Sequence, residues 1–136
     1  MSMILGFDPG RDKCGVAVVD KTYKVYDHRV IAAESAISQI EQLTTRFSSL
    51  ETIVMGNLTT SKSWRDRLHT AFPNHNIIMV DEKNSTLEAR DRYWQMYPPQ
   101  GWRKLIPHGL RLPPRPIDDI VAILLIERYF KTRKCE

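Results

Sequence analysis

Cysteine, long apolar runs and an N-terminal targeting signal are scarce or missing in this sequence. Only two cysteines occur, Cys14 and Cys135. Their spacing matches no metal-binding pattern, so we expect two free thiols, with a Cys14–Cys135 disulfide as the alternative. The longest apolar run, Ile120–Ile126, is much shorter than the ~20 residues of a membrane span, so no membrane partner is expected. The start has no basic segment and soon reaches Asp8, which predicts a cytoplasmic protein rather than an exported one.

A large excess of one charge is also absent. The 136 residues include 20 Lys and Arg and 16 Asp and Glu, a net charge of +4. The hydrophobic fraction of 42% and the charged fraction of 26% exclude a disordered chain and a fibre. This length fits one domain of ordinary size. A net charge this small allows a nucleic-acid partner but indicates one only if the basic residues cluster.

Apolar runs that end at turn residues predict five strands, and apolar residues three or four positions apart predict four helices. The expected strands are Met3–Asp8, Cys14–Asp20, Tyr23–Ile31, Thr52–Met55 and Ile77–Val80. The expected helices are 37–47, Ser63–Phe72, Thr86–Tyr97 and Ile117–Tyr129. Three strands so close in the chain pair as antiparallel hairpins, and strands then alternate with helices. We therefore expect an α/β fold with a mixed five-stranded sheet, helices on both faces, and a single domain over 1–136.

Acidic residues stand where the predicted elements end or begin. Asp8 closes the first strand, Asp81 and Glu82 close the last, and Asp118 and Asp119 open the last helix. Strand ends gather ligand sites in α/β sheets, and clustered carboxylates favour a hard cation such as Mg²⁺ or Mn²⁺. Two such ions about 3.5–4 Å apart form an arrangement that cleaves phosphodiesters. The alternative is that each acid serves only in a turn or as a helix cap.

The segment 98–116 is rich in proline and basic residues. It holds six of the eight prolines, and no acid occurs from Pro98 to Ile117. A long loop of this kind is usually functional or disordered. The basic side chains could neutralise phosphates while Trp102 stacks on a splayed base. Alternatively, the loop is solvated and its apolar residues pack against the core. The candidate nucleic-acid-binding residues in this loop are Arg103, Lys104, Arg111 and Arg115.

Two further groups of polar residues are candidates for nucleic-acid binding. Arg11 and Lys13 lie close to Asp8 in the chain and could touch the scissile strand, or could simply be exposed in a turn. A second group of polar residues lies just before the second predicted helix. These residues could bind phosphate or cap the helix. This second group comprises Thr59, Thr60, Ser61 and Lys62.

Several stretches together resemble the YqgF family, also called RuvX, of the RNase H-like superfamily. The run from Ile4 to Gly10, continued through Val18, resembles the opening hairpin of RNase H-like resolvases. The run from Val80 to Ala89 is similar to the Asp-Glu-x-x-Ser-Thr-x-Glu-Ala motif of the family. The run from Ile117 to Ala122 resembles its third motif, and Val54–Asn57 its glycine-containing loop. The resemblance extends over nearly the whole chain, and the motif around Glu82 is its most specific part.

The resemblance implies an RNase H-like fold and a site in which Asp8, Glu82 and Asp118 bind two Mg²⁺ or Mn²⁺ ions. Family members are described as Holliday-junction resolvases or as nucleases that process the 5′ end of pre-16S ribosomal RNA. We therefore expect an endonuclease, with branched DNA as the first substrate class and ribosomal RNA processing as the alternative. Two symmetric cuts in a junction imply a homodimer. A protein that binds nucleic acid or the ribosome without cleavage is the alternative of another class.

Three positions depart from the family pattern. Asn57 and Leu58 replace the usual Leu-Pro after the glycine, so substrate contacts there stay open. Asp119 stands where the family has a small residue, so either of two adjacent acids could hold the ion, although alignment favours Asp118. Val121 stands where the related RuvC resolvases carry a further Asp, which leaves a four-carboxylate site in question.

Overall fold

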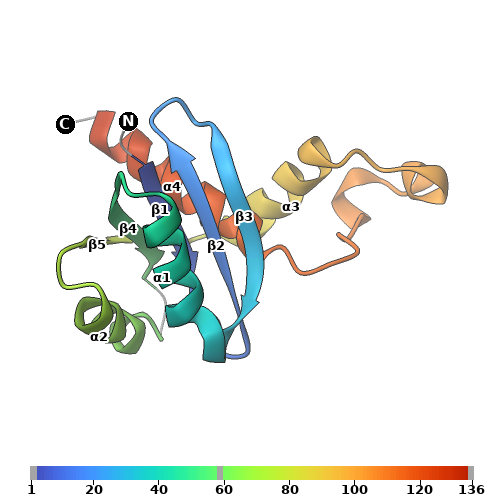
Figure 1. The fold of residues 1–136 in the computed structure, drawn as a ribbon. Coiled ribbons are helices and arrows are strands. Elements are labelled where there is room, and N and C mark those ends of the chain that lie inside the picture. Colours follow the sequence, from blue (N-terminus) through green and yellow to red (C-terminus); the bar gives the residue numbers. More distant parts are fainter. Residues whose placement is uncertain (1–2, 58–59, 135–136) are drawn as a thin grey trace.

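The protein folds around one mixed sheet (Figure 1). The computed structural model describes residues 3–57 and 60–134, with the side chains of 133 and 134 excepted. The strand order is β3-β2-β1-β4-β5. Antiparallel pairing joins β1 to β2 and β2 to β3, and parallel pairing joins β1 to β4 and β4 to β5. The strands are β1 (Met3–Asp8), β2 (Lys13–Asp20), β3 (Val25–Ala32), β4 (Leu50–Gly56) and β5 (Asn76–Val80). The expected mixed five-stranded sheet is thus confirmed.

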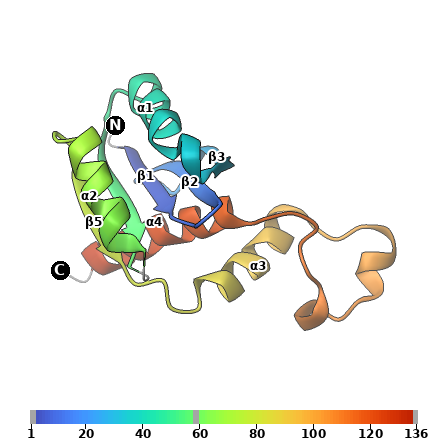
Figure 2. The same ribbon diagram turned by 90° about the horizontal axis from the view of Figure 1, so that it is seen from below.

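Helices cover both faces of the sheet, as expected (Figures 1 and 2). On one face, α1 and α2 pack over a core that includes Leu5 and Phe7 of β1. On the other face, α4 packs over Ile4 of the same strand, because successive side chains of a strand point to opposite faces. The α-helices are α1 (Ala36–Arg46), α2 (Ser61–Ala71), α3 (Ser85–Met96) and α4 (Asp118–Lys134).

The last helix is buried on nearly all sides. Every residue from Ile120 to Ile126 is buried, since α4 contacts the sheet on one side and α3 on the other. Gly6 of β1 and Gly15 of β2 let the helix approach closely: a Cβ at either position would overlap backbone atoms of α4. This seating fixes where the acidic start of α4 lies relative to the end of β1. Within the described residues, no helix is both long and apolar enough to cross a membrane.

The spacing of Ser85 and Glu88 predicts a capping box at the start of this helix, but the structure of α3 differs from that prediction. Asn84, with φ of 61°, precedes the helix, and no side chain caps it. Ser85 is already the first helical residue and is buried. Glu88, expected to reach back to the cap, instead pairs with Arg128 of α4 at 3.1 Å. A tertiary ion pair therefore takes the place of the predicted local contact.

Residues 98–116, named the arm below, project away from the sheet between α3 and α4 (Figures 1 and 2). The arm contains two short 3₁₀ helices, η2 (Gly101–Leu105) and η3 (His108–Leu110). Another 3₁₀ helix, η1 (Ala33–Ser35), lies outside the arm and precedes α1. The alternative in which the apolar residues of the arm pack against the core is wrong for most of them. The exposed fractions are 65% for Trp102, 85% for Leu105, 73% for Leu110 and 62% for Leu112.

Candidate active site

Asp8 stands at the end of β1, at the edge of the sheet where the parallel strands β4 and β5 also end. Its side chain hydrogen-bonds with the carboxyl groups of Glu82 and Asp118. Burial, followed by the hydrogen bond and repulsion from Glu82 and then by Asp118, raises the pKa of Asp8 to about 9. Burial and the two neighbouring carboxyl groups therefore favour the protonated form of Asp8 at neutral pH when no cation is bound.

Glu82 follows β5 and is almost fully buried, with 5% of its surface exposed. Its side chain lies against Gly56, the last residue of β4, and a Cβ at position 56 would overlap the Glu82 carboxyl group. The backbone N–H of Glu82 donates to Asn57 Oδ1 at 3.4 Å. Glu82 Oε2 is buried and has no hydrogen-bond partner. A buried carboxylate oxygen without a partner is costly, and a bound cation would satisfy it.

Asp118 is the first residue of α4. Its backbone packs against Gly15 of β2, which is the residue paired with Asp8 in the sheet register. Burial raises the pKa of Asp118, the hydrogen bond from Asp8 lowers it, and the charge of Asp119 raises it again. Three carboxyl groups, more than 30 residues apart in the chain, thus meet because β1, the end of β5 and the start of α4 share one edge.

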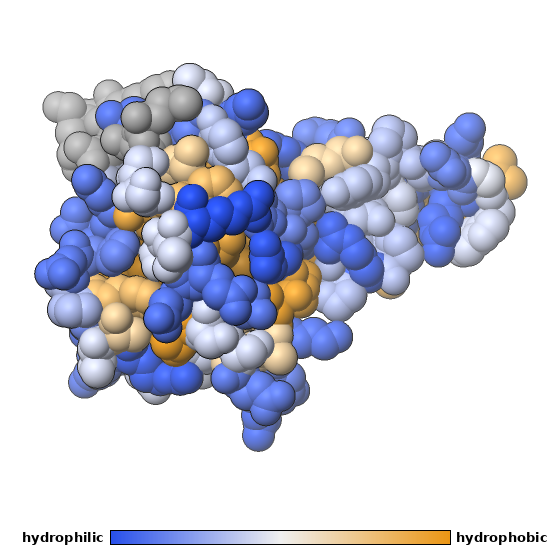
Figure 3. Space-filling view, in the orientation of Figure 1, coloured by the Kyte–Doolittle hydropathy of each residue, from blue (hydrophilic) through white to orange (hydrophobic). Residues whose placement is uncertain are grey.

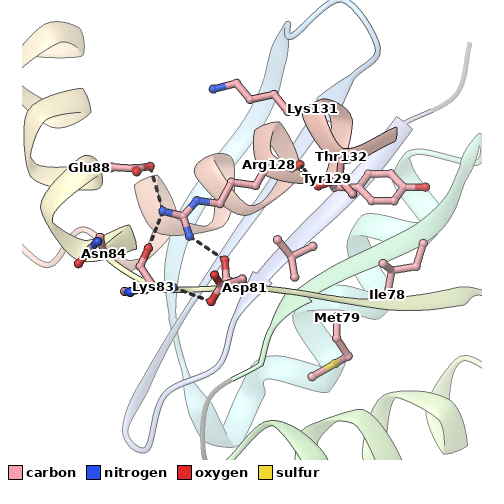
Figure 4. A pocket seen from close by; sticks show the side chains of 11 residues that line it. Ile78, Met79, Asp81, Lys83, Asn84, Glu88, Arg128, Tyr129, Lys131 and Thr132 are labelled. Atoms are coloured by element: carbon pink, nitrogen blue, oxygen red, sulfur yellow. Dashed lines mark hydrogen bonds and ion pairs between the residues drawn. The ribbon is translucent and has the colours of Figure 1, made fainter. Parts of the chain in front are cut away.

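Arg128 of α4 hydrogen-bonds with the backbone of the segment that carries Glu82 (Figure 4). The guanidinium donates to the backbone carbonyl of Asp81 at 2.7 Å and to that of Lys83 at 2.8 Å. Asp81 Oδ1 also accepts a hydrogen bond from the backbone N–H of Lys83 at 3.0 Å. The two carbonyls flank Glu82, so Arg128 fixes the backbone on both sides of it. A pocket of about 820 Å³ lies beside Arg128, but its lining includes none of Asp8, Glu82 and Asp118.

The donor set of the three acids fits a hard divalent cation. Carboxylate oxygens are the ligands that Mg²⁺ and Mn²⁺ prefer, and the orphaned Glu82 Oε2 is one of them. Within the described residues, no three His, Cys, Asp or Glu side chains are already spaced as ligands of one ion. The Asp8 carboxyl group instead interacts with those of Glu82 and Asp118, and its pKa is raised. Metal binding here would require Asp8 to lose its proton.

Asp119 is engaged elsewhere, although it neighbours Asp118. Its Oδ2 lies 2.7 Å from His28 Nδ1 of β3, and its Oδ1 accepts a hydrogen bond from Arg115 at 3.0 Å. Burial alone would raise the pKa of Asp119, but the bonds to His28 and Arg115 outweigh it and hold that pKa below its usual value. Both carboxylate oxygens are used, so we leave Asp119 out of the proposed metal ligands. Sequence reasoning missed His28, because nothing in its spacing marked a partner 91 residues away.

The other predicted binding residues outside the arm fall into two places. Arg11, in the turn that follows Asp8, and Lys13, the first residue of β2, are both exposed, and the charge of Lys13 acts on Asp118. Thr60 and Lys62 are exposed at the start of α2, Ser61 is buried there, and Thr59 lies outside the described residues. The start of α2 follows the end of β4, at the same edge of the sheet as Asp8. Both groups therefore lie near the end of the sheet where the three carboxyl groups meet.

The four basic residues of the arm are not equivalent. Arg111 donates to the backbone carbonyls of Arg103 and Ile106, at 3.1 Å and 2.9 Å, and so serves the arm itself. Arg115 pairs with Asp119. Arg103 lies over the ring of Trp102, with 5.0 Å to the centroid, and Lys104 is exposed. Of these four residues, Arg103 and Lys104 are the two whose side chains have no ion pair or backbone carbonyl partner within the described residues and that lie close in the chain to an exposed apolar side chain, Trp102.

Comparison with known proteins bears on the fold. No family model matches the sequence, and no match to a curated protein was found. The structure resembles Thermus thermophilus RuvC in complex with a Holliday junction substrate, with a TM-score of 0.62 and 18% identity over 98% of this chain and 96% of that one. It also resembles the fowlpox virus resolvase in complex with Holliday junction DNA, with a TM-score of 0.61 and 13% identity over 96% of this chain and 98% of that one. The chain therefore has the RNase H-like fold of these resolvases, over almost its full length.

Proposed function

We propose that this protein is a metal-dependent endonuclease that cleaves phosphodiester bonds in branched DNA and resolves Holliday junctions. The observation that carries the proposal is the convergence of Asp8, Glu82 and Asp118 at one edge of the sheet. Support also comes from the fold, because the similar RuvC and fowlpox structures hold Holliday junctions. The resemblance of the Glu82 motif to the YqgF family points to the same chemistry.

In this proposal the three carboxylates hold Mg²⁺ or Mn²⁺. The bound ions supply activation of water and stabilisation of the charge that develops on the leaving oxygen. Asp8 gives up its proton on binding, and Glu82 contributes the oxygen that now lacks a partner. Arg128 keeps Glu82 in place through the backbone, and Arg11 and Lys13 neutralise the phosphates beside the site. Two symmetric cuts across a junction require two such sites, so the active species is a homodimer.

The decisive experiment offers purified protein three labelled substrates with Mg²⁺ or Mn²⁺: a four-way DNA junction, a linear duplex of the same sequence, and precursor ribosomal RNA. We expect paired, symmetric nicks in the junction and little cleavage of the duplex. The Asp8→Asn, Glu82→Gln and Asp118→Asn variants should lose at least 100-fold in rate, since each removes a charged ligand. Asp119→Asn is the matched control.

The other outcomes separate the remaining functions. Cleavage of the RNA alone would replace junction resolution by ribosomal RNA processing with the same carboxylates. Binding without cleavage in any substrate, unchanged by Asp8→Asn, would make the protein a non-catalytic binder. Sedimentation of the protein with and without a junction tests the dimer independently.

A further inference from the structure

The arm concentrates the exposed apolar side chains of the molecule. Six large hydrophobic residues are exposed among the described residues, and Trp102, Leu105, Leu110 and Leu112 lie within the arm. Figure 3 shows the arm as a protrusion with a mostly hydrophilic surface and hydrophobic patches, one of them at its tip. Exposed apolar side chains gathered in one segment indicate a binding surface.

The arm is folded, so this exposure is built into the structure. The Arg111 guanidinium ties together the two halves of the arm through the carbonyls of Arg103 and Ile106. The Arg111 carbonyl accepts a hydrogen bond from the indole of Trp94, in α3, at 3.1 Å. His108 Nε2 lies 2.8 Å from Asp91 Oδ1, also in α3. These contacts hold the arm against α3 while its apolar side chains face solvent.

The base of the arm is attached to the start of the helix that carries Asp118. Arg115 pairs with Asp119 and lies over the rings of Tyr93 and Tyr97, at 5.3 Å and 5.8 Å from their centroids. One residue, Ile117, separates the arm from Asp118. A partner that binds the arm is therefore held in a fixed relation to the candidate active site.

The charge of the arm selects the class of partner. No acid occurs from Pro98 to Ile117, and Arg103 and Lys104 stand beside the exposed ring of Trp102. Basic groups beside an exposed aromatic ring match phosphates beside an unstacked base. Apolar wedges that enter base steps use the same combination. A second copy of this chain has a net charge of +4, so its overall charge is a poorer match for a basic arm than a polyanion.

We propose that the arm binds unstacked bases of the nucleic acid whose backbone lies in the active site, with Trp102 stacking on a base and Leu105 packing beside it. This inference rests on the proposed function, since it concerns the substrate of the same site. Unstacked bases occur at the crossover of a DNA junction and in single-stranded RNA, and a continuous duplex has none. The arm is therefore the element that distinguishes distorted nucleic acid from regular duplex.

The test measures binding by the full-length protein, with chelator present so that nothing is cut. The probes are a four-way DNA junction, a linear duplex and a single-stranded RNA. Trp102→Ala is expected to weaken binding to the junction by about tenfold, the loss of one base–aromatic stack, with less than a twofold change on the duplex. Trp102→Phe, which keeps a ring, should recover most of the affinity. Leu87→Ala, an exposed apolar residue of α3 outside the arm, is the matched control.

Fluorescence reports the contact directly, because the other tryptophans, Trp64 and Trp94, are each only 7% exposed. Acrylamide quenches exposed Trp102 in the free protein, and bound junction should protect it. Equal junction affinity of Trp102→Ala and the parent protein would overturn the inference. A shift from dimer to monomer in Trp102→Ala, with nucleic-acid affinity unchanged, would overturn it in favour of a contact between copies.

The two proposals fail in different ways. Binding that depends on Trp102 without cleavage in Mg²⁺ or Mn²⁺ would remove the endonuclease and leave the arm as a binding element. Cleavage that depends on Asp8, with no effect of Trp102→Ala on binding, would remove the role of the arm and leave the endonuclease. Protection of Trp102 by RNA but not by the junction would overturn the inference for branched DNA.

Discussion

The carboxyl group of Glu82 occupies the space that a side chain at Gly56 would need. Gly56 ends β4 and is paired with Val80, two residues before Glu82. The glycine is required here for room and not for its backbone freedom, since its φ is not positive. One small residue on a neighbouring strand thereby determines where a candidate metal ligand lies.

Gly56→Ala should displace the Glu82 side chain and reduce metal-dependent cleavage at least tenfold. The carboxyl group is the mobile end of a side chain, so it can move aside and the stability cost should be about 1–3 kcal/mol. Cleavage rates at several Mg²⁺ concentrations, together with urea unfolding, measure both effects. Gly109→Ala is the control, because a Cβ at Gly109 meets no atom within 4 Å. Normal cleavage by Gly56→Ala would show that Glu82 is not needed at its present position.

Arg128→Ala should raise the Mg²⁺ concentration needed for half-maximal cleavage, because the backbone on both sides of Glu82 loses its donor. Arg128→Lys should recover little, since a lysine lacks the planar fork that reaches both carbonyls. The matched control is Lys131→Ala, an exposed residue that lines the same pocket. A loss of stability without a change in Mg²⁺ dependence would mean that Arg128 supports the fold alone.

The sequence carried enough information for the strands and for the acids at their ends. An apolar run such as Met3–Asp8 can be recognised as a strand from local sequence alone. Only the pairing of strands depends on distant residues, and the rules for hairpins and parallel crossovers leave few possible pairings. Asp8, Glu82 and Asp118 therefore lie together at one edge of the sheet, as the resemblance implied. The side-chain contacts that give each acidic residue its partner could not be predicted from the sequence. Glu88 has the spacing of a capping residue, yet in the structure it pairs with Arg128, 40 positions later.

The pH dependence of stability, measured without metal, should reveal the raised pKa of Asp8. The pKa of Asp8 is about 9 in the folded protein and near 3.8 when unfolded, so the native state holds a proton that unfolding releases. The stabilisation that this proton gives is present at low pH and is lost as pH rises toward 9. With chelator present, the free energy of unfolding should fall from pH 5 to pH 8, by at most about 1.4 kcal/mol per pH unit from this group.

The Asp8→Asn variant isolates this effect, because the amide does not titrate. Its free energy of unfolding should fall less between pH 5 and pH 8 than that of the parent protein, measured by urea unfolding. Added Mg²⁺ should stabilise the parent protein most at the higher pH, since the ion competes with the proton. Equal pH dependence in the two proteins would contradict a raised pKa at Asp8.

Asp118 and Asp119 should respond in opposite ways to the same substitution, because adjacent residues of a helix point about 100° apart. Asp118 joins the carboxyl cluster, so Asp118→Asn should abolish cleavage and, by relieving repulsion, leave metal-free stability equal or higher. Asp119→Asn should keep cleavage within a few-fold and lose about 1–3 kcal/mol of stability, since His28 and Arg115 lose a charged acceptor. Mg²⁺-dependent cleavage and urea unfolding of the two variants are compared under one set of conditions. The reverse pattern, with cleavage lost in Asp119→Asn and kept in Asp118→Asn, would assign the metal to the second acid. The same change at two neighbouring positions thus separates a ligand from a structural ion pair without altering the size of either side chain.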